Sequence, residues 1–181
     1  GVLGLQSTGA LSLGELSSTE AVLFYLTTYG LMTLGAFAVV SLVRDAGGET
    51  TQLSRWAGLG KESPLVAGVF AFFLLAMAGI PLTSGFVAKV AAFLPAVAHG
   101  GLSGVVLVVI GVLASAVTAF VYLRVIVLMY FTEPSGEVTL AQPALLSVVA
   151  VAVGVVLTIL LGVFPGPLLE LAEQSSVFIP R

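Results

Sequence analysis

The sequence contains no cysteine, a single histidine and few charged side chains. Without cysteine the chain cannot form disulfides, thiolate metal sites or cysteine-ligated iron–sulfur clusters, and one histidine cannot build a metal cage. Neither a P-loop nor a GxGxxG motif is present. Six basic and nine acidic residues give a formal net charge of -3, which argues against nucleic acid as a partner. We therefore expect no metal and no cofactor in this chain itself.

Apolar residues make up most of the chain. Of its 181 residues, 59% are hydrophobic and only 8% are charged, and the mean hydropathy is +1.18. Soluble domains are about half apolar and a quarter charged, so this chain has too little charge to cover a water-facing surface. The 21 glycines and 8 prolines are compatible with transmembrane helices, in which both residues are commoner than in soluble ones. The composition predicts an all-α, polytopic transmembrane bundle.

Four runs are long enough to cross a bilayer, which takes about 20 apolar residues for roughly 30 Å of hydrocarbon. They cover residues 21–43, 64–98, 102–131 and 144–164. Three of the six basic residues lie in the intervening loop 44–63, so the positive-inside rule predicts that this loop is cytoplasmic and the tail 165–181 external.

The chain opens on Gly1 without the basic segment of a signal peptide. We expect residues 1–14 to be the end of a further transmembrane helix, and the sequence to be the C-terminal piece of a longer protein.

The run 64–98 would be roughly 50 Å long as one straight helix, well beyond the hydrocarbon thickness. Within it, Pro81 removes a backbone donor, and Gly79 and Gly85 permit conformations that other residues resist. These residues predict a discontinuous helix, with a break that shortens the span. We expect the break near the middle of the membrane. Non-helical backbone there is tolerated only when it is buried in protein or lines a hydrated cavity. A proline kink or a steep tilt is the alternative.

Lys89 follows the predicted break and is the only charged residue far from a helix end. A charge at the bilayer centre costs about 2.5 to 3.5 kcal/mol on insertion scales, so a retained one is usually functional. Burial disfavours the ammonium form of a lysine, whereas a nearby carboxylate favours it. Lys89 is therefore predicted to hold or release a proton according to its neighbours. A snorkelling side chain or a static ion pair is the alternative.

Hydroxyl side chains lie at helical spacing on two of the predicted helices. Because a hydroxyl can both donate and accept, they could hold a chain of water beside Lys89; they are Tyr25, Tyr29, Ser115, Thr118 and Tyr122. The alternative for each is a bond to its own helix or, for tyrosine, an anchor at the membrane interface. His99 is a candidate external proton port, although a lone interfacial histidine is more often structural.

Three segments make the chain recognisable. FYLTTYGLMTLGAFAVVSLV (24–43), LAMAGIPLTSGFVAKVAAF (75–93) and VYLRVIVLMYF (121–131) resemble the C-terminal helices of subunit N of bacterial respiratory complex I, the proton-pumping NADH:quinone oxidoreductase. The similarity covers nearly the whole chain in order and spacing, and AGIP-x-T-x-GF-x-x-K is its specific part.

The resemblance implies a fourteen-helix, antiporter-like subunit with two inverted repeats, in which 64–98 is a broken helix and Lys89 its proton-carrying lysine. The family often has Pro at Leu82, Gly at Ala88 and Phe at Val90, so the detailed geometry of the break can differ. The resemblance also implies a bacterial plasma-membrane location and other membrane-arm subunits as partners. NADH, flavin, iron–sulfur clusters and quinone would belong to partner subunits.

The resulting hypothesis is proton translocation in the membrane arm of complex I, with Lys89 as a switchable carrier. One rival is a subunit of a multi-subunit sodium/proton antiporter, which needs no redox partner. The other is a membrane scaffold whose broken helix only packs against its neighbours.

Overall fold

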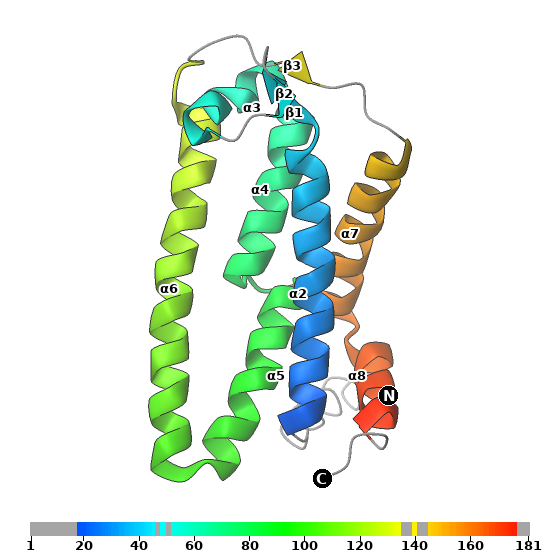
Figure 1. The fold of residues 1–181 in the computed structure, drawn as a ribbon. Helices are drawn as coiled ribbons and strands as arrows, with labels where there is room; N and C mark the ends of the chain where they lie inside the picture. Colours follow the sequence, from blue (N-terminus) through cyan, green and yellow to red (C-terminus); the bar gives the residue numbers. More distant parts are fainter. Residues whose placement is uncertain (1–17, 46–47, 50–51, 135–138, 141–144, 177–181) are drawn as a thin grey trace, which may run out of the picture.

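In the part of the chain that the structure describes, six helices form one bundle. The computed structural model describes residues 18–45, 48–49, 52–134, 139–140 and 145–176, so the expected helix end at 1–14 lies outside the described residues. The bundle contains α2 (Ser18–Val40), α4 (Pro64–Ala78), α5 (Ser84–His99), α6 (Gly101–Phe131), α7 (Leu145–Val163) and α8 (Gly166–Ser176). The helices α2, α4, α5, α6 and α7 run along a common direction, with α6 and α7 on opposite flanks (Figure 1).

The predicted all-α bundle with one discontinuous helix is confirmed. Helices α4 and α5 lie end to end and are separated by residues 79–83, which are not helical. Helices α4 and α5 together run alongside the unbroken 31-residue α6 (Figure 1). That the break shortens the membrane span stays a prediction. The break leaves backbone groups without helical partners part-way along the bundle.

One end of the bundle carries a cap that the sequence does not predict. Three short strands form an antiparallel sheet in the order β2-β1-β3, with β1 at Val43–Asp45, β2 at Gly48–Glu49 and β3 at Thr139–Leu140. Beside it lie the 3-10 helix η1 (Leu53–Trp56) and α3 (Leu59–Glu62). The sheet ties the connection after α2 to the connection after α6, so both lie at the same end (Figure 1).

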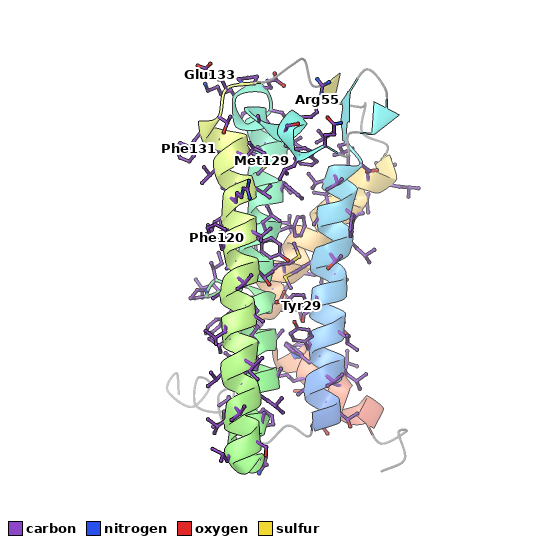
Figure 2. All side chains as sticks on the ribbon, turned by 60° about the vertical axis from the view of Figure 1, so that its left-hand side comes forward. Tyr29, Arg55, Phe120, Met129, Phe131 and Glu133 are labelled. Carbon is purple, nitrogen blue, oxygen red and sulfur yellow. The ribbon has the colours of Figure 1, made fainter. Side chains whose placement is uncertain are left out.

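Three of the described helices are long and apolar enough to cross a membrane: Thr19–Val40, Gly101–Phe131 and Leu145–Val163. Helices α4 and α5 are shorter apolar helices, and the predicted crossing by the two together stays a prediction. Most of α6 is exposed, and Phe120 and Phe131 point outward from it (Figure 2). A helix surface of this kind suits contact with hydrocarbon or with further helices.

Two neighbouring helices pack closely against Phe73 of α4, whose side chain is fully buried. A Cβ atom at Gly35 of α2 would collide with the Phe73 ring, and one at Gly154 of α7 would lie 3.0 Å from its Cζ atom. The two glycines thus let α2 and α7 approach the same ring from two sides. Small residues play this part between membrane helices, where close backbone approach replaces a hydrophobic driving force.

The expected external tail is helical where the structure describes it. In α8, Pro167 lies in the first turn, where proline is tolerated because its missing N–H would have no helical partner. Leu169 is buried against Phe24 of α2 and Val87 of α5. Helix α8 therefore packs beside α2 and α5 near the end of the bundle opposite the strands (Figure 1).

The packing at Phe73 gives a matched pair of substitutions within α2. Gly35→Ala should destabilise the protein by about 1–3 kcal/mol, because the new methyl group overpacks a site in which the ring cannot retreat. Gly30→Ala adds the same methyl group where no atom lies within 4 Å, so it should leave stability unchanged or slightly increased. Thermal unfolding of the detergent-solubilised full-length protein measures both, and equal midpoints for the two variants would contradict the packing.

Candidate functional site

The site begins at the end of α4. The last four carbonyls of a helix have no helical partner and need another donor. Here the N–H of Gly79 donates to the carbonyls of Leu75, at 3.1 Å, and Ala76, at 3.0 Å. Gly79 adopts φ +93°, a left-handed conformation that glycine takes without strain. The backbone of the break thus satisfies two of the four carbonyls and leaves those of Met77 and Ala78 to side chains.

Lys89 supplies the first of these side chains. Its Nζ atom donates to the carbonyl oxygen of Ala78 at 2.7 Å and to that of Met77 at 3.2 Å. The amine reaches back from α5 across the break, because Lys89 lies on the second turn of the helix and faces the end of α4. The C-terminal end of a helix is also the negative end of its dipole, so this position favours an ammonium group.

Tyr29 of α2 is the second side chain that donates to the end of α4. Its hydroxyl donates to the same Met77 carbonyl at 2.9 Å. The ring stacks on that of Tyr25, with centroids 4.3 Å apart and an interplanar angle of 21°. In Figure 2 the Tyr29 ring points from α2 into the space between α2 and α6. Met77 therefore offers one acceptor to two donors.

Two other predicted break residues shape the junction. Gly85, in the first turn of α5, approaches α4 so closely that a Cβ atom there would collide with the Ala76 carbonyl oxygen. After Pro81, the backbone passes through Leu82 at φ +69°, and the Thr83 hydroxyl donates to the Ile80 carbonyl at 2.7 Å. A side chain at position 85 would push α5 away from α4 and move Lys89 from its acceptors.

A cavity of about 440 Å³ opens beside Lys89 between α2, α5 and α6. All five predicted path residues line it together with Lys89: Tyr25, Tyr29, Ser115, Thr118 and Tyr122. Its other walls are mostly apolar side chains and include Met77, Ala92, Phe93 and Gly111. The volume is large enough for several water molecules, which need polar partners of this kind to stay in place.

The hydroxyls in the cavity are not equivalent. Thr118 donates to the Ala114 carbonyl of its own helix at 2.9 Å, the alternative considered for such residues. Its oxygen still has acceptor capacity toward the cavity.

His99 is exposed at the end of α5, about 15 Å along the helix from Lys89, and does not line the cavity. Its role as an external port stays a prediction.

The sequence did not predict the acceptors of the Lys89 amine. They are backbone oxygens of Met77 and Ala78, so no side chain marks them. The available signal was the predicted break itself, because a helix that ends at this depth leaves carbonyls without helical partners. Within the described residues, no group of three or more histidine, aspartate or glutamate side chains could hold a metal ion.

Comparison with known proteins places the chain in a family. Residues 3–118 match the family model described as NADH:quinone oxidoreductase/Mrp antiporter, TM. NADH-quinone oxidoreductase subunit N of Rhodococcus opacus is 58% identical over 90% of this chain, and subunit N 3 of Streptomyces griseus is 60% identical over 88%. The chain spans 29% and 28% of the lengths of these two relatives.

The fold is also similar to that of a chain of respiratory complex I. A chain in the structure of respiratory complex I from Thermus thermophilus with bound aureothin superimposes with a TM-score of 0.67 at 33% sequence identity. The match covers 89% of this chain and 35% of that one. Together with the apolar helices, these similarities identify a multi-pass membrane protein. The chain belongs to the NADH:quinone oxidoreductase/Mrp antiporter family of transmembrane proteins.

Proposed function

We propose that this chain conducts protons in the membrane arm of an NADH:quinone oxidoreductase, with Lys89 as a switchable proton carrier. The observation that carries the proposal is the Lys89 amine on the carbonyls of Met77 and Ala78, next to a cavity lined by hydroxyls. An ammonium there is held by two acceptors and by the negative end of α4. A neutral amine would lose the charge-assisted part of both bonds, so its release toward the cavity would cost less.

The arrangement supports a carrier because the holding groups are uncharged. A carboxylate at the same distance would favour the ammonium so strongly that the proton would rarely leave. Carbonyl groups stabilise the ammonium form less than a carboxylate would. A charge that arises in a neighbouring part of the complex could therefore shift the equilibrium between the ammonium and the neutral amine. Within the described residues, the amine is bonded to backbone oxygens and to no carboxylate.

Redox chemistry is assigned to partner subunits in this proposal. NADH, flavin, iron–sulfur clusters and quinone would bind there, and quinone reduction would drive proton movement through this chain. The family description also includes Mrp antiporters. The relatives at 58% and 60% identity are NADH-quinone oxidoreductase subunits, which favours the redox-driven assignment over the antiporter. Co-purification with flavin- and iron–sulfur-containing subunits would separate the two.

Substitution of Lys89 tests the proposal directly. Lys89→Ala in the assembled complex should lower proton pumping by about tenfold or more while assembly is retained. Lys89→Arg should lower proton pumping to a similar extent, because a guanidinium keeps its proton in proteins. Proton uptake into inverted membrane vesicles, measured with a pH-sensitive dye during NADH oxidation, gives the readout. Unimpaired pumping by assembled Lys89→Ala complex would reject the carrier role, and pumping by Lys89→Met would support the scaffold.

A second test moves the amine without removing it. A Cβ atom at Gly79 would lie 3.1 Å from Lys89 Cδ and 3.2 Å from Nζ, so Gly79→Ala should displace the amine and reduce pumping. Gly101→Ala is the matched control, since Gly101 also has positive φ, at +54°, but no atom lies within 4 Å of its Cβ position. Both variants should lose about 1 kcal/mol of stability through backbone strain. An equal loss of pumping in both would show that strain, not the amine, is responsible.

A further inference from the structure

The hydroxyl of Tyr29 and the amine of Lys89 converge on the single carbonyl of Met77. Their distances to its oxygen differ: the hydroxyl lies at 2.9 Å and the amine at 3.2 Å. The amine is closer to the carbonyl oxygen of Ala78, at 2.7 Å, which accepts from no second donor among the described residues. The Met77 carbonyl, which Tyr29 and Lys89 share, therefore makes the longer of the two hydrogen bonds to the amine.

We propose that Tyr29 is a positioning residue that sets how tightly Lys89 holds its proton, by occupying the Met77 carbonyl. This inference rests on the proposed function of Lys89 and deepens it. A carbonyl that already accepts a bond from a phenol has less acceptor strength left for an ammonium. Tyr29 thus weakens one of the two bonds that stabilise the charged amine.

The position of Tyr29 is held independently of Lys89. Its ring stacks on Tyr25 one helical turn away, and the neighbouring Thr28 hydroxyl is bonded within α2. A Tyr29→Phe substitution keeps the stacked rings and removes the hydroxyl that donates to Met77. The Met77 carbonyl is then free to accept fully from Lys89, so the ammonium form becomes more stable.

Among the residues that the structure describes, few other titratable groups face the amine. From α2 these are Tyr25 and Tyr29, and from α6 it is Tyr122, all of which line the cavity. Helices α4 and α7 contribute none, since neither contains a charged residue, histidine or tyrosine. Glu170 of α8 is exposed at the end of the bundle. Because Tyr122 adds a hydroxyl to the same cavity without a bond to Met77, Tyr122→Phe is the matched control.

The test follows the titration of the amine itself. Acetic anhydride acylates neutral amines and not ammonium groups, so the rate at which Lys89 is acetylated, measured by mass spectrometry in the assembled complex, reports its protonation. The rate is recorded from about pH 6 to about pH 10.5, where an ordinary lysine is half neutral. Tyr29→Phe should move the midpoint to higher pH, so that labelling below the midpoint slows about threefold to tenfold. Tyr122→Phe should leave the midpoint in place.

An unchanged or lower midpoint in Tyr29→Phe, or an equal shift in Tyr122→Phe, would overturn the inference. A merely structural role for Tyr29 would change the labelling rate reached at high pH and not the midpoint. The proposed function fails differently: the cavity has room for the reagent, so a Lys89 that stays unlabelled at the highest pH would contradict the carrier role.

Discussion

The site depends on the carbonyl groups that are left when α4 ends inside the bundle. In water such groups would be solvated, but at this depth each unsatisfied one is costly. The break satisfies two of them through the N–H of Gly79, and Tyr29 and Lys89 satisfy the other two. A charged side chain in an apolar region and a helix end without partners are each unfavourable alone. Placed together, the ammonium and the carbonyls stabilise one another.

Close packing holds this arrangement in place. Gly85 brings the start of α5 against the Ala76 carbonyl, and Gly162 of α7 is so close to the break that a Cβ atom there would collide with the Leu82 carbonyl oxygen. Farther along α4, the Phe73 ring packs between Gly35 of α2 and Gly154 of α7. Because the helices touch through glycine, the two half-helices cannot shift without displacing their neighbours. The side chain of Lys89, half-buried beside the cavity, retains more freedom.

Much of this could be predicted from the sequence, because hydrophobic length and helix-breaking residues are local signals. The apolar runs, the break at Gly79 and Pro81, and Lys89 just beyond it follow from them. The partners of the amine depend on how helices pack, which a single sequence does not encode locally. Tyr29 was predicted only as one hydroxyl among several, and the strand pairing of Val43 with Leu140 joins residues almost a hundred positions apart.

In the proposed mechanism, the end of α4 holds the protonated amine of Lys89 and releases the neutral amine. High-resolution electron cryomicroscopy of the whole complex, on samples frozen at pH values below and above the titration of Lys89, tests it most directly. We expect the amine to lie within hydrogen-bond distance of the Ala78 carbonyl at the lower pH and to turn into the cavity at the higher pH. An amine that stays on the carbonyls at both pH values, or that pairs with a carboxylate at both, would contradict it.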